Sequence, residues 1–391
     1  MQFTLKALLG LLATVSLASA VSFDMEYVGP EKRGISGEEL HKLHGEQFQA
    51  RVAKGVYLGV GNETNIDKRG KSANVDLDDK SGHAWLVKAK VGSEGEEVRM
   101  MLDSGYEHAL IAADSYSPKK SSTSENTGED FNAAFMTGGG NRGTIYKDDV
   151  SVGGLKASGL AFGYTKERDF SNDQNIGGML GMALSGHQES APAFARHGWN
   201  GFLKTLEDQG VIDEAKYQMT LKSDGGKLAI GEVDDSQYEG DLETVPNTGL
   251  QYGHCGFQGT LNGKKHNFLL DSGTAGIGGS YNSIKKFLQG ISGVELVENE
   301  KDGSVSGKID CDKLPDVKIT VADKFDIKIP EDSLKLYEMG GGKCMLPFFG
   351  YTNIPMSYDY NWIAGGTIMK QVSVVCTFGS NKMQIAKQKS D

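Results

Sequence analysis

Residues 99–111 read RMMLDSGYEHALI, and residues 267–279 read NFLLDSGTAGIGG. Each stretch places two apolar residues directly before Asp-Ser-Gly, and the two aspartates are 168 positions apart. A second apolar pair followed by glycine comes later in each half, at residues 179–181 and at residues 363–365. One supersecondary plan is therefore used twice, which predicts two lobes with a boundary near residue 240.

From about residue 75 onward, the sequence pattern is typical of an all-β protein. Short alternating stretches such as AWLVKAKV and YQMTLKSDGGKLAIGEV are separated by clusters of Gly, Asn, Asp and Ser. VSVGGL at residues 150–155 and TLNGKKHNFLLD at residues 260–271 predict hairpins, the second with its turn at Asn262-Gly263.

Helical patterns are few and short. They cover residues 198–210 and residues 281–291, and Ser280 or Asn282 could cap the second helix. Residues 119–130 read KKSSTSENTGED, a low-complexity segment that predicts a surface loop.

Length and charge limit the classes of function. The chain has 391 residues, which is enough for two lobes of ordinary size. With 52 acidic against 41 basic residues, its formal charge is −11. This balance argues against nucleic acid and against an anionic membrane surface as the main partner.

The N-terminal segment predicts entry into the secretory route. Residues 1–20 combine one lysine, an apolar run and the small-residue ending Ala-Ser-Ala, which is typical of a signal peptide. The apolar run is too short to span a bilayer, and no later stretch is long and apolar enough to do so. We therefore expect a secreted, extracellular protein with no membrane partner; a vacuolar destination is the alternative.

A propeptide is expected at residues 21–69. This stretch is polar and compatible with helix, and it contains the dibasic pairs Lys32-Arg33 and Lys68-Arg69. Cleavage after Arg69 would coincide with the change to the β pattern. The glycosylation sequon at Asn62 lies inside this segment, so the mature chain would carry none.

The four cysteines of the chain all fall in its second half: Cys255, Cys311, Cys344 and Cys376. In an oxidising compartment an even number predicts disulfides, and three connectivities are possible. No pair has the short spacing of a structural zinc site, so we expect no metal there.

The repeated Asp-Ser-Gly predicts a specific chemistry. An aspartate after a buried apolar pair lies at the end of a core strand, and the glycine two positions later lets the backbone turn sharply. If the repeat brings Asp103 and Asp271 together, they cannot both ionise at low cost, so the pair shares one proton. The ionised carboxylate can then take a proton from water while the protonated carboxyl polarises a peptide carbonyl. A single Asp-Ser-Gly is a common turn, but two copies in matching surroundings favour this catalytic interpretation.

These residues resemble the pepsin-like aspartic endopeptidases, peptidase family A1, over nearly all of residues 75–391. LLDSGTAGIGG resembles the family's second catalytic loop, GGGNRGTIYKDDVSVGGL its flap hairpin, and WIAGGTIMKQVSVVCTFGSNKMQIA its closing strands. The resemblance implies an all-β, bilobal fold with a central active-site cleft, divided here into residues 75–240 and 241–391. It also implies a zymogen whose mature form cleaves polypeptides at acidic pH without a metal or other cofactor. We expect it to be a monomer.

The resemblance also implies roles for particular residues. Asp103 and Asp271 are the catalytic pair. The residues that support the pair are Ser104, Gly105, Ser272, Gly273 and Thr274. The flap tip comprises Phe135, Met136, Thr137, Gly138, Gly139 and Gly140. The stretch from Cys311 to Cys344 resembles the family's C-terminal disulfide loop, which leaves Cys255 and Cys376 either paired or free.

The first loop and the flap depart from the family pattern. That pattern continues Asp-Thr-Gly-Ser-Ser and then reaches a tryptophan, whereas this chain has Tyr106 at the first of these serines and Leu110 at the tryptophan. Tyr106 removes a hydroxyl that supports the catalytic pair and adds bulk. The family's flap tyrosine aligns with Met136, and Gly366 occurs where an aspartate is common.

Two functions from different classes therefore remain. The first, which we favour, is a secreted aspartic endopeptidase; both aspartates and the processing signals support it. The second is a catalytically weak or inactive protein on the same scaffold that binds peptides or proteins, which the altered loop and flap support. The sequence contains neither the Gly-x-Ser-x-Gly motif of serine hydrolases nor the His-Glu-x-x-His motif of zinc proteases. His108 is expected to be a packed or surface residue rather than a participant.

Overall fold

The computed structural model of the chain describes residues 84–135, 140–167, 175–184, 192–249, 253–299, 303–352, 362–378, 380 and 382–389, and the backbone of residues 21–28. Three expected features lie outside these residues. They are the signal peptide, the part of the propeptide that contains Asn62 and both dibasic pairs, and the flap residues 136–139.

The larger sheet contains thirteen described strands in the order β11-β24-β23-β9-β10-β1-β2-β3-β8-β4-β7-β6-β5. β2 also pairs with β6, so this end of the sheet curls back on itself. The strands are β1 (Val21–Val28), β2 (Ala84–Val91), β3 (Glu96–Asp103), β4 (Ala109–Ala112), β5 (Glu125–Ala134), β6 (Gly140–Val152), β7 (Leu155–Thr165), β8 (Gly178–Gly181), β9 (Lys216–Lys222), β10 (Gly225–Ile230), β11 (Tyr238–Pro246), β23 (Val372–Thr377) and β24 (Lys382–Gln388).

The smaller sheet contains eleven described strands, ten of them in the order β18-β17-β12-β13-β22-β14-β21-β16-β20-β19, with β15 paired to β16. They are β12 (Gly256–Leu261), β13 (Lys264–Leu270), β14 (Ile277–Ser280), β15 (Glu295–Asn299), β16 (Ser304–Asp310), β17 (Val317–Val321), β18 (Phe325–Ile329), β19 (Tyr337–Gly340), β20 (Lys343–Met345), β21 (Phe348–Tyr351) and β22 (Trp362–Ala364). The short helices are α2 (Pro192–His197), α3 (Phe202–Asp208), α4 (Tyr281–Gln289), α5 (Glu331–Leu334) and α6 (Gly366–Met369).

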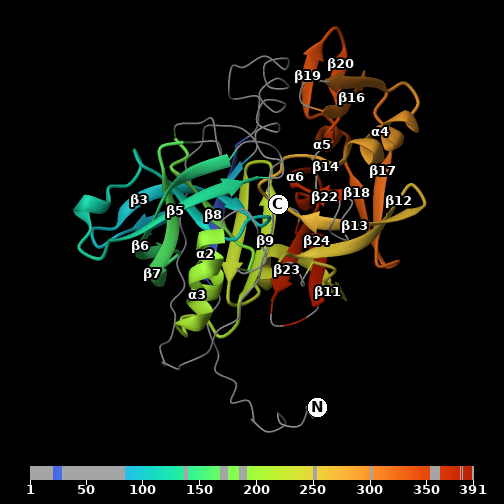
Figure 1. Cartoon of the computed structure of the whole chain (residues 1–391). Coiled ribbons are helices and arrows are strands. Elements are labelled where there is room, and N and C mark those ends of the chain that lie inside the picture. The colour runs from blue at the N-terminus through green and yellow to red at the C-terminus, as the bar shows by residue number, and fades with distance from the viewer. Residues whose placement is uncertain are drawn as a thin grey trace, which may run out of the picture.

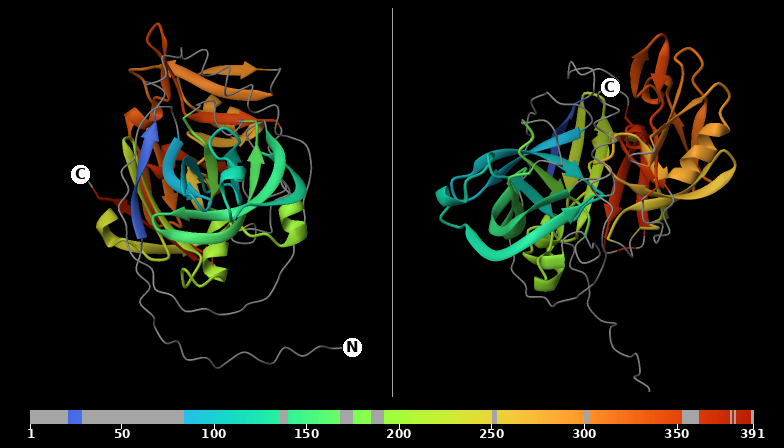
Figure 2. Two further views of the ribbon diagram at one scale, coloured as in Figure 1. Left: turned by 90° about the vertical axis from the view of Figure 1, so that its left-hand side faces the viewer. Right: turned by 45° about the horizontal axis from the view of Figure 1, so that its top comes forward.

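The strands form two lobes, as expected. Figure 1 shows β3 and β5–β8 on one side, β12–β22 on the other, and β9, β23 and β24 between them. The two lobes are also distinct in the tilted view of Figure 2. The all-β, bilobal fold implied by the family resemblance is therefore confirmed.

The C-terminal strands return to the first lobe. β23 pairs antiparallel with β9, and β24 pairs antiparallel with β23 and with β11. The sheets therefore divide the chain differently from a single boundary near residue 240, because residues 372–388 belong to the larger sheet.

A strand of the expected propeptide is part of the larger sheet. β1 pairs antiparallel with β10, with Val21 opposite Ile230. Further along, β1 pairs antiparallel with β2, with Glu26 opposite Leu86. The segment that directly follows the expected signal peptide thus connects two strands of the first lobe.

The sequence repeat is also a repeat of topology. In the first half, β3 runs parallel to β8, and β4 pairs antiparallel with β8 and parallel with β7. In the second half, β13 runs parallel to β22, and β14 pairs antiparallel with β22 and parallel with β21. Each Asp-Ser-Gly therefore leaves a core strand at the same point of the same local plan.

Local signals for turns and helix caps are confirmed. Asn262 and Gly263 have φ of 49° and 74°, as a two-residue hairpin turn between β12 and β13 requires. α4 begins where the pattern predicted, and the Ser280 side chain accepts a hydrogen bond from the Ser283 amide. α3 lies within the other predicted helical stretch, residues 198–210.

The surface loop predicted at residues 119–130 is wrong in its second half, because β5 begins at Glu125. β5 is an edge strand, so its polar side chains face solvent and hide the β pattern. Its partner β6 spans thirteen residues, and Glu125 lies opposite Lys147. Pairing with this long neighbour, rather than its own composition, makes the segment a strand.

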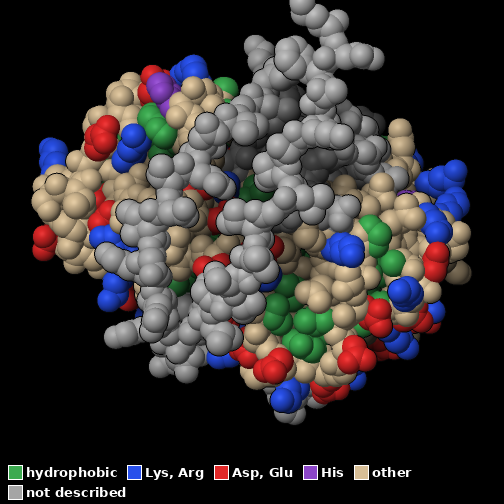
Figure 3. All heavy atoms as spheres, turned by 90° about the horizontal axis from the view of Figure 1, so that it is seen from below, with side chains coloured by type: hydrophobic (Ala, Val, Ile, Leu, Met, Phe, Trp, Pro, Cys, Tyr) green, Lys and Arg blue, Asp and Glu red, His purple; other side chains and the backbone are tan. Residues whose placement is uncertain are grey.

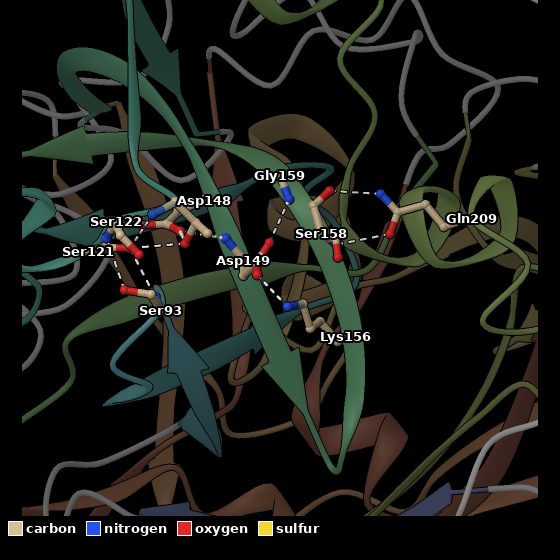
Figure 4. Close-up of polar contacts among 10 residues, drawn as sticks. Ser93, Ser121, Ser122, Asp148, Asp149, Lys156, Ser158, Gly159 and Gln209 are labelled. Atoms are coloured by element: carbon tan, nitrogen blue, oxygen red, sulfur yellow. Dashed lines mark hydrogen bonds and ion pairs between the residues drawn. The ribbon is translucent and has the colours of Figure 1, made fainter. Parts of the chain in front are cut away.

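A polar network anchors the segment before β5. Asp148 on β6 is buried, and its carboxylate accepts hydrogen bonds from Thr123 Oγ1 at 2.5 Å and from the Tyr116 hydroxyl. The Ser93 amide donates to Ser121 Oγ at 2.9 Å (Figure 4). Burial, together with the hydrogen bond to Asp148, raises the pKa of Tyr116. The buried carboxylate is therefore satisfied by hydroxyl donors.

Large apolar side chains fill both lobes. The largest fully buried ones are Trp85, Trp362, Tyr217, Phe162, Phe194, Phe202, Phe257, Phe268 and Phe348.

Within the described part of the chain, every helix is too short or too polar to cross a bilayer. On the face shown in Figure 3, the described Lys, Arg, Asp and Glu side chains are interspersed, rather than forming the extended basic surface that nucleic acids bind.

All four cysteines form disulfides. Cys311 bonds to Cys344 and so joins the end of β16 to β20. Cys255 bonds to Cys376 and so joins the residue before β12 to β23. The second bond links the smaller sheet to the larger one.

Candidate active site

The two Asp-Ser-Gly loops begin where core strands end. Asp103 is the last residue of β3 and lies opposite Gly181 of β8. Asp271 directly follows β13, and its amide donates a hydrogen bond to the Ala364 carbonyl of β22. Apolar residues before each aspartate are buried, so each strand is held in the core while its carboxylate leaves it.

Each carboxyl group lies over the glycine of the opposite loop. A Cβ atom added at Gly105 would be 2.8 Å from Asp271 Cγ, and one added at Gly273 would be 2.6 Å from Asp103 Oδ2. No other residue type fits at these positions without displacing a carboxylate. The fold therefore brings Asp103 and Asp271 into one site.

The serines of the two loops hold each other. The Ser104 amide donates to Ser272 Oγ at 3.0 Å, and the Ser272 amide donates to Ser104 Oγ at 2.9 Å. Each hydroxyl then donates to the opposite strand: Ser104 Oγ to the Leu270 carbonyl and Ser272 Oγ to the Leu102 carbonyl. These reciprocal bonds join the two lobes at the base of the site.

Donors within each loop orient the carboxylates. The Gly105 amide donates to Asp103 Oδ1 at 2.8 Å, and the Gly273 amide donates to Asp271 Oδ1 at 2.9 Å. Thr274 Oγ1 donates to Asp271 Oδ2 at 2.7 Å. Asp271 is 8% exposed, so these bonds act in a largely dry site.

A buried tyrosine interacts electrostatically with the pair. Tyr217 of β9 is fully buried, and burial, with the negative charges of Asp271 and Asp103, raises the pKa of its phenol. The charges of both aspartates thus disfavour ionisation of the same phenol. Nothing in the local sequence around Tyr217 marks it as a neighbour of the site.

Tyr106 takes the position in the first loop that Thr274 has in the second. Its side chain is buried in an apolar cluster with Leu110 and Phe135, and its ring meets Phe135 edge-on at 5.5 Å. Leu110, at the family's tryptophan position, is fully buried in this cluster. Of the flap residues named from the sequence, the structure describes Phe135, which is buried, and Gly140, which begins β6.

His108 is a packed residue, one of the two environments expected for it. Its ring stacks on Phe194 of α2 at 4.0 Å, and its Nε2 lies 3.2 Å from Glu107 Oε2. Sequence reasoning missed this pairing with Glu107. The only signal in the sequence was a glutamate next to a histidine, directly after the first Asp-Ser-Gly and Tyr106.

Gly366 has a packing reason. A Cβ atom there would lie 2.3 Å from the Trp85 ring of the first lobe, so the family's common aspartate would not fit.

One group of described residues has ligand atoms within 4.8 Å of one another: Cys311, Glu338 and Cys344. Its two sulfurs, however, form a disulfide. This group offers no thiolates to a metal.

Comparison with known proteins agrees with this geometry. The chain matches the family described as "Eukaryotic aspartyl protease" over residues 61–388. It is 67% identical over 390 residues to the protein named "Probable inactive secreted aspartyl protease" of Malassezia globosa, covering 99% of this chain and 100% of that one. It is 30% identical over 324 residues to "Secreted aspartyl protease 1" of the same organism, covering 82% and 78%. It is 23% identical over 427 residues to "Syncephapepsin" of Syncephalastrum racemosum, covering 99% and 100%. The chain therefore belongs to the eukaryotic aspartyl protease family.

Proposed function

We propose that this chain is a secreted aspartic endopeptidase in which Asp103 and Asp271 activate water for attack on a peptide bond. The observation that supports it most directly is the position of each carboxyl group over the glycine of the opposite loop. Reciprocal bonds between the two loops add to this support. The substrate is an extended polypeptide, and the protein acts as a monomer.

The pair carries out both proton transfers. Two carboxyl groups this close hold one proton between them, because two negative charges side by side are costly. The ionised member takes a proton from water as the water oxygen bonds to the carbonyl carbon, and the protonated member gives its proton to the carbonyl oxygen. One carboxyl then gives its proton to the amide nitrogen, while a hydroxyl of the tetrahedral intermediate returns a proton to the other. The C–N bond breaks, and the pair again holds one proton.

The surrounding donors would keep the carboxylates in place during these steps. Gly105, Gly273 and Thr274 each donate a hydrogen bond to one of them. Fixed donors of this kind need no rearrangement when charge moves between the two groups. Ser104 and Ser272 support the loops rather than the reacting atoms.

Residues 21–69 act as a propeptide in this proposal. β1 lies inside the larger sheet, which supports a propeptide that folds as part of the zymogen. Cleavage after Arg69 would separate β1 from the mature chain. Secretion is supported by the N-terminal segment and by the names of the two Malassezia relatives.

A second candidate is a non-catalytic protein that binds peptides or proteins in the same site. Tyr106 supports it, because the first loop has no small hydroxyl residue at the position of Thr274. The word "inactive" in the name of a relative 67% identical to this chain points the same way. Both aspartates, the glycine donors and the reciprocal serine bonds are present, which favours the enzyme.

The deciding experiment is cleavage of a denatured protein between about pH 3 and pH 6. The processed wild-type chain is compared with Asp271→Asn, and with Asp316→Asn as a control in which an exposed aspartate is changed. We expect cleavage that a transition-state-mimic inhibitor blocks, that Asp271→Asn abolishes and that Asp316→Asn retains. A folded, processed wild-type chain that cleaves nothing but binds the inhibitor would establish the second candidate instead.

A further inference from the structure

Three buried residues distinguish the first catalytic loop from the second. In both halves, the strand after the loop begins at the sixth residue past the aspartate. In the intervening loop, the second half has Thr-Ala-Gly at residues 274–276, and the first has Tyr106, Glu107 and His108, all buried. A buried acid and imidazole are costly unless they are paired, so this segment is not a neutral replacement.

The second loop is held by its backbone. The Ile277 amide donates to the Pro347 carbonyl at 2.6 Å, and a Cβ atom at Gly276 would lie 2.5 Å from that same oxygen. Glycine is therefore required for this close approach. The first loop has His108 in place of Gly276, although β4 pairs with β7 as β14 pairs with β21, with Ala109 opposite Phe162 and Ile277 opposite Phe348. The two loops therefore differ in their side chains.

Glu107 and His108 pair with each other in the interior. His108 Nε2 lies 3.2 Å from Glu107 Oε2, and the side chains are 4% and 2% exposed. Among the described residues, His108 Nδ1 meets no hydrogen-bond partner. The Nε2 edge of the ring therefore faces the Glu107 carboxylate, and this contact sets the orientation of the ring.

The ring of His108 connects the loop to α2. It stacks on Phe194 with an angle of 14° between the planes, and Phe194 in turn meets Phe131 of β5 edge-on at 6.4 Å. α2 is also tied to β5 by charge, because Arg196 Nη2 and His197 Nε2 lie 2.6 Å and 3.1 Å from Glu129. α2 thus lies between the first catalytic loop and the strand that leads to the flap.

The geometry points to Glu107 and His108 as positioning residues for Asp103. Their contact fixes the imidazole over Phe194 and so holds the first loop against α2 and β5. Their role is to hold the loop that carries Asp103. The inference rests on the proposed function and adds the residues that hold the Asp103 carboxylate in position.

The test compares three variants of the processed protein. Glu107→Gln keeps an oxygen acceptor for His108 Nε2, Glu107→Ala removes it, and His108→Phe keeps the stacked ring without the donor. A misplaced catalytic group lowers the rate of the chemical step, so kcat is expected to fall about 10- to 100-fold in Glu107→Ala and His108→Phe. KM should change less than about threefold, and Glu107→Gln should stay within about threefold of wild type in both constants.

Glu97→Ala, which removes an exposed acid from β3, is the control and should match wild type. Equal kcat in Glu107→Gln and Glu107→Ala would overturn the inference, as would a loss confined to KM. If Glu107→Ala fails to fold, the comparison of Glu107→Gln with His108→Phe makes the same decision.

Backbone hydrogen exchange gives a readout that does not depend on cleavage. Residues 103–112 should exchange faster in Glu107→Ala than in Glu107→Gln, while the strands of the smaller sheet remain unchanged. Equal exchange in the two variants would overturn the inference. A wild-type chain that cleaves nothing would refute the proposed function alone, and the exchange result would still decide whether the pair holds the loop.

Discussion

At the scale of single residues, the site is built from atoms that cross between the lobes. Ser272 Oγ accepts from the Ser104 amide and donates to the Leu102 carbonyl, so one hydroxyl satisfies two buried backbone groups of the other half. Serine suffices at both positions because the contacts need only the hydroxyl. The methyl group of a threonine is not used in these bonds.

Ser272→Ala should therefore cost more than one hydrogen bond. It leaves a buried amide and a buried carbonyl without these partners, which predicts a loss of about 2–3 kcal/mol in the free energy of unfolding. Urea denaturation of the variant checks this value. Ser158→Ala, at an exposed position, is the control; equal stability of the two variants would contradict the prediction.

Tyr106→Thr should raise the activity of the protein and lower its stability. It gives the first loop the residue found at Thr274, whose hydroxyl donates to its aspartate, so we expect a higher kcat/KM for cleavage. It also empties space that the buried ring fills beside Phe135, which predicts a loss of about 2–4 kcal/mol in the free energy of unfolding.

Tyr106→Phe is the matched control for this change. It keeps the ring and lacks the new hydroxyl, so its stability and its kcat/KM should both stay near wild type. A folded Tyr106→Thr variant with no gain in kcat/KM would show that the missing hydroxyl does not limit the first loop.

At the scale of elements, charged pairs support the β16–β20 ladder beside the Cys311–Cys344 bond. Asp310 accepts from Lys313 at 2.8 Å and lies 2.6 Å from Lys343. These two ammonium groups lower the pKa of Asp310 to about 2, and Asp310 and Glu295 raise the pKa of Lys343 to about 12. The pairs therefore remain ionised in the acidic range in which we propose that the enzyme acts.

Asp310→Asn should destabilise the protein in a pH-dependent way. The pKa of Asp310 in the folded chain is below the usual value of about 3.9, so its ion pairs contribute stability above that value. The contribution is lost as pH falls through about 2. The difference in Tm between wild type and variant should be present near neutral pH and disappear toward about pH 2.

The Tm difference should be small because the group is exposed, and salt should reduce it. Asp316→Asn, which removes an exposed carboxylate 3.9 Å from Lys328, serves as the control. A Tm difference that grows on acidification would contradict the assignment of the ion pairs.

Elements also show where sequence patterns succeed and fail. The turn at Asn262-Gly263 and the cap at Ser280 were predictable because both depend on residues within a few positions. The strand from Glu125 was not, because its residues are polar on an exposed edge and only pairing with β6 makes them a strand. The tip of that hairpin, residues 136–139, stays a prediction.

At the scale of the whole molecule, the two disulfides differ in the parts of the chain that they join. Cys311–Cys344 closes 33 residues within one lobe, whereas Cys255–Cys376 closes 121 residues and joins the smaller sheet to the larger one. A longer closed loop restricts the unfolded chain more. The bond between the sheets should therefore contribute more to stability.

Replacement of each cysteine pair by serine checks this order. Loss of Cys255–Cys376 should lower the free energy of unfolding by about 5 kcal/mol, and loss of Cys311–Cys344 by about 4 kcal/mol. Both values come from urea denaturation without reductant. A larger loss for Cys311–Cys344 would contradict the chain-entropy argument.

The sequence by itself determined the family, the two-lobed β architecture, the repeated Asp-Ser-Gly loops and the hairpin turns. These features depend on the order of neighbouring residues or on the repetition of a short motif, and both can be read along one chain. The tertiary structure alone decided which residues meet: Gly105 with Asp271, Gly366 with Trp85, and His108 with Phe194. Such contacts join residues that are far apart in the sequence, and no local pattern encodes them, because they arise only when the strands have packed.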